Sequence, residues 1–245
     1  MRLHPKILFL VLAVVVGLTV IVGYPGLFSE LTAQQRVSPV ARQNKMIPIP
    51  LAAEEADLQK RLERQEKNRR FYNPRGDDLM AQGEGEIFGR TSYAEPSSAI
   101  PVTESDFIIL GRVLKAQPYF AEANTSIYSE FEVAIEEIIA ESTNRGTRRN
   151  GPVMVTREGG AIKMPDERII QFTVSGIGAL PERDKRYLFF LKPACSQCLD
   201  FSIVVGYELD RNTLIPIDRI KDSATYEGMS ESDFVSAVKK AVKSN

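Results

Sequence analysis

The two cysteines are the residues whose type and spacing point most directly to chemistry. Both Cys of the chain fall in a single Cys-x-x-Cys pattern, at Cys195 and Cys198. Such a pair can close a disulfide or exchange disulfides with another thiol. A redox pair normally opens a helix, whose dipole lowers the thiol pKa, whereas here the second cysteine leads into a predicted strand. We therefore favour a structural disulfide or idle thiols, with a thiol-disulfide protein as the alternative function.

The sequence does not contain the residue patterns of a c-type haem site or a zinc site. Leu199 rather than His follows Cys198, so the c-type haem attachment pattern is absent. A zinc site needs four ligands, and the single His of the chain is His4, ahead of a long apolar run. Without a further His, neither a Ser-His nor a Cys-His nucleophile pair can form. We predict no catalytic, cofactor or metal site and no enzyme activity, with an enzyme that uses carboxylates, Ser or Lys as a second alternative.

The charge of the chain does not select nucleic acid as a partner. The 31 Lys and Arg residues nearly balance the 32 Asp and Glu residues, unlike the composition of a polybasic nucleic-acid binder. One predicted loop, residues 142–151, is locally basic through Arg145, Arg148 and Arg149. We interpret it as a solvated loop, with contact to an anionic partner as the alternative.

An uncharged apolar run from Ile7 to Gly23 determines the compartment in which all later residues lie. Continued through Phe28 as a helix rising about 1.5 Å per residue, it covers a hydrocarbon core of about 30 Å. Basic residues precede the run, so the positive-inside rule leaves residues 1–6 in the cytoplasm. We predict that Ile7–Phe28 is a retained signal anchor in contact with membrane lipid, and that the C-terminal domain is extracytoplasmic. Signal cleavage, which would give a secreted protein, is the alternative.

Residues 29–105 have the composition of a linker. Prolines punctuate a segment that is poor in large aliphatic residues and can bury little apolar surface. Residues 52–70 within it are rich in good helix formers and carry the favourable i, i+4 pair Glu63 and Lys67. Its apolar content is little more than Leu58 and Leu62, so we predict a solvated, charged helix there, with a partner-binding or dimerising helix as the alternative.

The segments after residue 105 have the pattern of a β domain, residues 106–245. Phe107 to Val113 is a short apolar run, and Pro118 is expected to end that strand. From Ile127 to Ile139 apolar residues occupy odd positions and acids such as Glu130 the even ones, which predicts a long strand with one face in water. Further short strands are expected at residues 153–156, 162–164, 169–174, 187–191, 201–207 and 213–217. Their spacing favours a sandwich or barrel over parallel βαβ units.

The C-terminus is predicted to be a helix over residues 230–243. Ser230 can cap it, and Asp233 stands where a capping box places its acid. Phe234, Val238 and Val242 form a stripe that can pack on the β domain. The fold class is therefore mainly β (α+β), with a transmembrane helix and a linker ahead of the domain.

The order DFIILGRV, IYSEFEVAIEEII, VMVTREGG and KRYLFFL resembles the OB-like barrel of netrin-type (inhibitor-of-metalloproteinase-like) domains and of uncharacterised bacterial exported proteins. The resemblance covers residues 106–210 and implies a small antiparallel OB-like barrel with a binding face. The multiple disulfides and inhibitory N-terminal Cys of the animal domains have no counterpart, so inhibition of proteases is not implied. We predict a single-pass membrane-anchored protein whose extracytoplasmic β domain binds or scaffolds an envelope partner, either a protein or a glycan.

Overall fold

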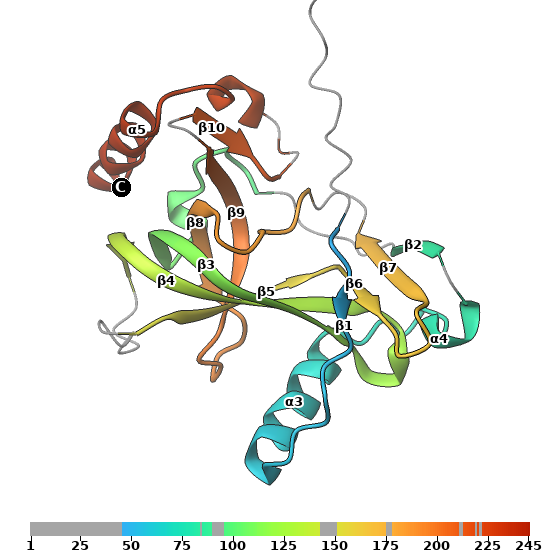
Figure 1. The fold of residues 1–245 in the computed structure, drawn as a ribbon. Coiled ribbons are helices and arrows are strands. Elements are labelled where there is room, and N and C mark those ends of the chain that lie inside the picture. Colours follow the sequence, from blue (N-terminus) through green and yellow to red (C-terminus); the bar gives the residue numbers. More distant parts are fainter. Residues whose placement is uncertain are drawn as a thin grey trace, which may run out of the picture. The chain divides into compact units, whose positions relative to one another are not determined.

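The segment with alternating apolar residues forms the strand β4 (Ile127–Glu141) in the computed structural model of the chain (Figure 1). The structure describes residues 46–83, 85–89, 96–142, 151–174, 178–210, 213–218, 220 and 222–245. Odd-numbered side chains of β4 such as Phe131 and Val133 are buried, because successive residues of a strand point to opposite faces. The predicted long strand is confirmed.

Strand β3 (Phe107–Phe120) pairs with β4 in antiparallel orientation and is longer than the sequence predicts. It continues through Pro118, which lies opposite Ser129. The strand β8 (Arg186–Pro193) pairs with β3 from Phe107 to Arg112, so Pro118 lies beyond the part of β3 that this neighbour borders. A residue without an amide proton is tolerated at such an edge position, and the expectation that Pro118 ends the strand was wrong.

Gly111 lets β3 and β4 approach each other closely at a shift in their register. A Cβ at this position would lie 2.6 Å from Cγ1 of Val133 and 2.8 Å from the carbonyl oxygen of Ala134. Any larger residue would therefore force the two strands apart.

The strands β5 (Val153–Glu158), β9 (Phe201–Asp210) and β10 (Thr213–Pro216) complete a six-stranded sheet in the order β10-β9-β5-β4-β3-β8. An additional antiparallel pairing joins β8 to β9. The pairings of β3, β4, β5, β9 and β8 thus form a closed cycle, in which β5 and β9 are the parallel pair. The prediction of a mainly β domain is confirmed.

A second, four-stranded sheet has the order β1-β6-β7-β2. Its centre is the predicted hairpin of β6 (Gly160–Lys163) and β7 (Ile169–Val174). The flanking strands β1 (Ile49–Pro50) and β2 (Gly85–Gly89) pair in parallel orientation with β6 and β7 respectively. Both flanking strands come from the segment that the sequence assigns to a linker.

Residues Met46–Asn245 accordingly form one compact unit, which begins well before residue 106. The linker prediction is corrected for the described residues between 46 and 105, because backbone pairing, charged contacts and a few apolar side chains such as Leu79 hold them against the domain. The predicted anchor Ile7–Phe28 lies outside the described residues and stays a prediction. None of the helices in the described part of the chain has both the length and the hydropathy needed to span a membrane.

The side chains inside the strand cycle form one apolar cluster, to which every strand of the cycle contributes, including Phe107, Phe131, Val155, Phe189 and Phe201. A second cluster lies on the other face of β3, β8 and β9. The helix α5 (Glu231–Ser244) packs into this second cluster through Phe234, Val235 and Val238. Ser230 caps α5 by accepting a hydrogen bond from the amide of Asp233 at 3.2 Å, so the predicted C-terminal helix and its cap are confirmed.

An ion pair is buried among these apolar side chains. Arg157 on β5 and Asp218 after β10 have side chains that are 5% and 6% exposed and are joined by hydrogen bonds from the guanidinium to the carboxylate. The carboxylate also accepts a hydrogen bond of 2.9 Å from the amide of Gly206 on β9. The pair ties β5, β9 and the segment after β10 together.

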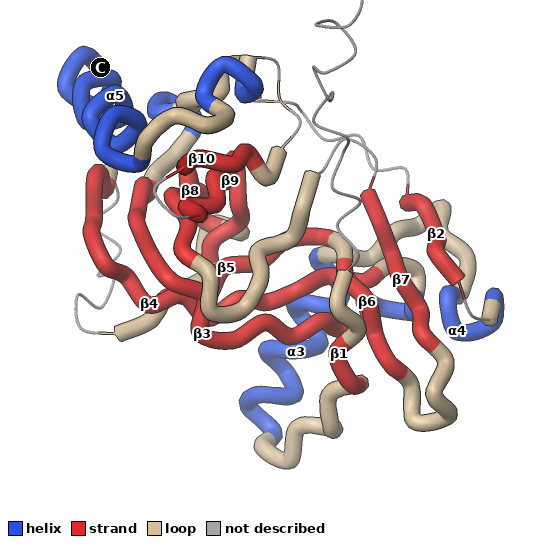
Figure 2. The backbone as a smooth tube through the Cα atoms, turned by 45° about the horizontal axis from the view of Figure 1, so that its top comes forward, coloured by secondary structure: helices blue, strands red, loops and turns tan. Residues whose placement is uncertain are grey.

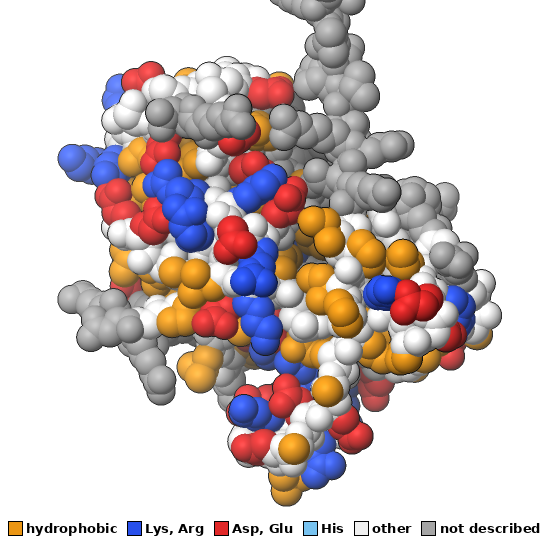
Figure 3. All heavy atoms as spheres, in the orientation of Figure 1, with side chains coloured by type: hydrophobic (Ala, Val, Ile, Leu, Met, Phe, Trp, Pro, Cys, Tyr) orange, Lys and Arg blue, Asp and Glu red, His pale blue; other side chains and the backbone are white. Residues whose placement is uncertain are grey.

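The remaining helices are short or lie at the periphery. The helix α3 (Leu58–Arg70) and α5 lie at opposite ends of the unit (Figures 1 and 2). The helix α4 (Leu79–Gln82) precedes β2, and single 3₁₀ turns are present at Val102–Glu104, Glu122–Asn124 and Ser223–Tyr226. On the face shown in Figure 3, acidic and basic side chains are intermixed.

Candidate binding site

The helix α3 is held against the domain by charged side chains. Asp57 caps its N-terminus by accepting a hydrogen bond of 2.8 Å from the amide of Gln59, and the helix has no buried residue. Arg64, Lys67 and Arg70 recur every three residues, which places them along one side of the helix. Each of them contacts a carboxylate of the β domain.

Glu130 on β4 is the acid to which the middle of α3 binds. Its carboxylate accepts hydrogen bonds from Arg64 Nη1 at 2.6 Å, from Arg64 Nη2 at 3.2 Å and from Lys67 Nζ at 2.8 Å. The Glu130 side chain is only 7% exposed, although the alternating pattern predicts that it faces water. That expectation was wrong because α3 covers this face of β4.

Aromatic rings complete the seam between α3 and the sheet. The guanidinium carbon of Arg64 lies 3.4 Å from the ring centroid of Tyr119, which is cation–π geometry. Phe71, directly after α3, stacks on Tyr128 with a centroid separation of 4.5 Å. The Tyr128 hydroxyl lies 2.8 Å from the side-chain amide of Asn68. Two strands therefore present tyrosines to one side of α3.

The electrostatics of the seam favour the ionised form of Glu130 and the neutral form of Tyr128. Burial raises the pKa of Glu130, but hydrogen bonds from Arg64 and the charges of Lys67 and Arg64 outweigh it, so the pKa lies below its usual value. Burial raises the pKa of Tyr128 and keeps this phenol neutral, although the charge of Arg64 opposes the shift. The seam thus joins an ionised acid to two cations beside neutral phenols.

Acid is expected to release α3. Because the pKa of Glu130 is lower in the folded than in the unfolded protein, its ionised form stabilises the docked helix above the ordinary Glu pKa of about 4.3. This stabilisation is lost as the pH falls through the lower, folded pKa. Hydrogen exchange over residues 58–70, corrected for the intrinsic pH dependence, should accelerate as the pH falls below the ordinary Glu pKa and through the lower, folded pKa of Glu130.

The helix α5 is the internal control for this acid titration, because apolar side chains hold it. Its exchange should not accelerate over the same pH range. Unchanged protection of α3 below the folded pKa of Glu130 would show that the ion pairs do not hold that helix.

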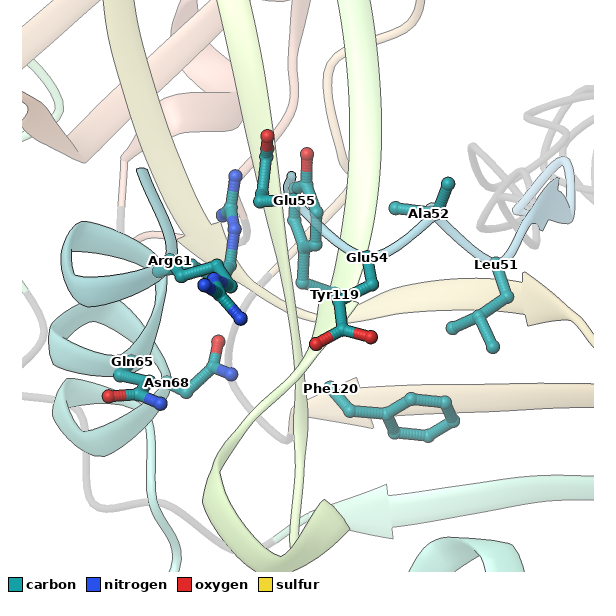
Figure 4. Close-up of a pocket in the computed structure, with 11 residues that line it drawn as sticks. Leu51, Ala52, Glu54, Glu55, Arg61, Gln65, Asn68, Tyr119 and Phe120 are labelled. Carbon is teal, nitrogen blue, oxygen red and sulfur yellow. The ribbon is translucent and has the colours of Figure 1, made fainter. Parts of the chain in front are cut away.

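A pocket of about 310 Å³ opens beside α3, and its wall is formed by the helix, by the segment that precedes it and by the end of β3. Arg61, Gln65 and Asn68 line it from α3, while Glu54 and Glu55 line it from the preceding segment (Figure 4). The lining also includes Leu51, Tyr119 and Phe120. The pocket therefore offers charges of both signs next to apolar and aromatic surface.

One polar atom at this wall is buried without a partner. The Nε of Arg64 has no hydrogen-bond partner among the described residues. The two Nη atoms of the same guanidinium bind Glu130 and the Tyr128 hydroxyl. Arg64 therefore belongs to both the seam and the pocket.

The predicted cysteine site lies at the other end of α3. Cys195 and Cys198 form a disulfide in the β8–β9 connection. Arg70, the last residue of α3, donates a hydrogen bond of 3.1 Å from Nη1 to the Sγ of Cys198. The same guanidinium binds both carboxylate oxygens of Asp200, at 3.2 and 2.9 Å. The predicted anionic-partner loop, Arg145, Arg148 and Arg149, lies outside the described residues.

The residues that make this site do not stand out in the sequence. Arg64, Lys67 and Arg70 look like the solvated side of a charged helix, and Glu130 looks like one of several acids on a water-facing strand. The three-residue spacing of the bases is a signal of one charged face, but the sequence does not say which acid it meets. No known protein-family model matches the sequence, and no curated protein matches it either.

Proposed function

We propose that the chain is a single-pass membrane-anchored protein whose extracytoplasmic domain binds an envelope protein in the pocket beside α3. The uncharged run Ile7–Gly23, preceded by basic residues, supports the anchor and its orientation. The observation that carries the binding role is the pocket of about 310 Å³ between α3, residues 51–55 and β3.

The lining of the pocket suits a protein segment. Carboxylates of Glu54 and Glu55 and the guanidinium of Arg61 can pair with charged side chains of either sign, while Leu51 and Phe120 can cover an apolar one. Its volume is at the lower end of the range of about 300 to 1,000 Å³ for ligand pockets. It therefore has room for a few side chains of a partner.

We also propose that an OB-like barrel is the scaffold of this pocket. The closed cycle of β3, β4, β5, β9 and β8 supports it, because an OB fold is a small Greek-key barrel built from that number of strands. OB folds commonly bind ligands on the face of their second and third strands. In this chain those strands are β4 and β5, and Glu130 of β4 is where α3 docks.

Site-directed photocrosslinking in cells tests the binding role. A photoreactive residue in place of Gln65, which lines the pocket, should give a discrete crosslinked protein. The same residue in place of Lys240, exposed on α5, is the matched control and should not give that product. Loss of the Gln65 adduct on Arg61→Glu would tie it to the pocket, and equal adducts at both positions would exclude a specific site.

A reporter that is active only in the cytosol, fused after Asn245, tests the topology separately. The proposed orientation predicts an inactive fusion and an active one when the same reporter precedes Met1. Activity at the C-terminal end would overturn the extracytoplasmic location.

A further inference from the structure

The Cys195–Cys198 disulfide joins residues that the fold already holds together. It lies at the end of the β8–β9 hairpin, where Pro193 pairs with Phe201 and the amide of Ala194 donates to the carbonyl of Asp200 at 3.0 Å. The sequence separation of the two cysteines is 3. Closing so short a loop between strands that are already paired restrains the unfolded chain little, so fixing the hairpin is a weak reason for the bond.

The two sulfurs of the disulfide have different surroundings. Cys195 is exposed to solvent, whereas Cys198 is half-buried and receives the hydrogen bond from Arg70. Asp200, with a side chain that is 6% exposed, accepts hydrogen bonds from both Nη atoms of Arg70, and Nη1 is also the atom that donates to Cys198. The cation is therefore fixed in direction, with one N–H aimed at the sulfur of Cys198.

In the sequence, Cys198 leads into a strand, so no helix dipole is available to stabilise a thiolate. The structure supplies the positive charge from elsewhere, since Arg70 reaches Cys198 from α3 across 128 positions of the chain. A neighbouring Arg lowers a thiol pKa in the same way as a helix N-terminus does. In disulfide exchange, the thiol with the lower pKa is the better leaving group.

We propose that this disulfide exchanges with a dithiol partner, that Cys195 is the sulfur attacked, and that Cys198 leaves as a thiolate paired with Arg70. A partner thiolate attacks the Sγ of Cys195, which is an exposed residue. The Cys195–Cys198 bond breaks, a mixed disulfide forms on Cys195, and Cys198 keeps the electron pair. The second thiolate of the partner then attacks the mixed disulfide, which leaves an oxidised partner and the reduced Cys195–Cys198 dithiol. Two electrons pass from the partner to this chain. The inference is independent of the proposed binding function.

The reduction rate of the full chain by dithiothreitol tests the role of Arg70. Reaction is stopped with acid, free thiols are alkylated, and intact mass gives the reduced fraction. Arg70→Gln removes the charge but keeps a side-chain donor, and should slow reduction on the order of tenfold. Arg70→Lys should keep most of the rate. Arg69→Gln, the adjacent residue with a side chain that is 70% exposed, is the matched control and should leave the rate unchanged.

The outcome that overturns the role of Arg70 is a wild-type reduction rate in folded Arg70→Gln. Equal slowing in Arg70→Lys and Arg70→Gln would also overturn it, because the charge would then not matter. Circular dichroism confirms that each variant folds.

Single-cysteine variants test the direction of exchange without altering Arg70. The pH dependence of alkylation by iodoacetamide gives the thiol pKa of Cys198 in Cys195→Ser and that of Cys195 in Cys198→Ser. The proposal expects the lower pKa at Cys198. A lower pKa at Cys195 would reverse the assignment of attacked and leaving sulfurs.

Discussion

Replacing Asp218 with Ala is expected to lower the free energy of unfolding by about 3 to 5 kcal/mol. The substitution leaves the guanidinium of Arg157, 5% exposed, without its carboxylate partner, and an uncompensated buried charge costs that amount. It also removes the acceptor that Asp218 offers to the Gly206 amide. Urea denaturation followed by circular dichroism measures the change, as a lower midpoint with an unchanged slope.

Lys239→Ala is the matched control for this substitution. It breaks the ion pair of Lys239 with Glu137, whose side chains are 45% and 42% exposed, and should cost no more than about 1 kcal/mol. The double variant Arg157→Met with Asp218→Leu should recover most of the lost stability, because apolar side chains of similar size avoid the cost of burying charge. Equal losses of unfolding free energy in Asp218→Ala and Lys239→Ala would contradict the larger stabilising role given to the buried Arg157–Asp218 pair.

Glu130→Gln is expected to undock α3 while the β domain stays folded. The change removes the common partner of Arg64 and Lys67, whose side chains are 19% and 22% exposed. Because these cations are not fully buried, we expect a cost of about 2 to 3 kcal/mol, below the 3 to 5 kcal/mol of a fully buried pair. Hydrogen exchange over α3 should accelerate roughly 30- to 150-fold, since each 1.4 kcal/mol is a factor of ten.

The expected release of α3 follows from what the helix lacks. It has 13 residues and none of them is buried, and an isolated helix of that length is marginal in water. Glu132→Gln, two residues along β4 and on the same face, is the control, and exchange over residues 58–70 should not change in it. Protection of α3 that survives Glu130→Gln would assign the docking to the contacts that remain, which are the Arg70–Asp200 ion pair and the stacked rings of Phe71 and Tyr128.

The elements that the sequence predicts well are those whose stability comes from apolar burial. The alternation around Phe131 and Val133, the apolar run at residues 187–191 and the stripe of Phe234 and Val238 each indicate side chains that are buried. The Ser230 cap is equally local, because its partner is three residues away. Nothing distant is needed to find any of these.

The candidate site could not be predicted because it depends on pairing between charges that are far apart in the sequence. Arg64 and Glu130 are 66 positions apart, and Arg70 and Asp200 are 130 apart. A charged side chain has the same appearance in a sequence whether water or a buried carboxylate faces it. Apolar content alone therefore predicts that the segment from residue 46 to 105 does not fold, although its bases, its short strands and Leu79 bind it to the domain.

The positions of β1 and β2 bear on how this protein can be handled in solution. They cover the two outer margins of the β6–β7 hairpin. A fragment that starts at residue 106 would lose both and expose unsatisfied backbone groups, which are templates for aggregation. A recombinant fragment of the compact unit should therefore start at Met46, where that unit begins.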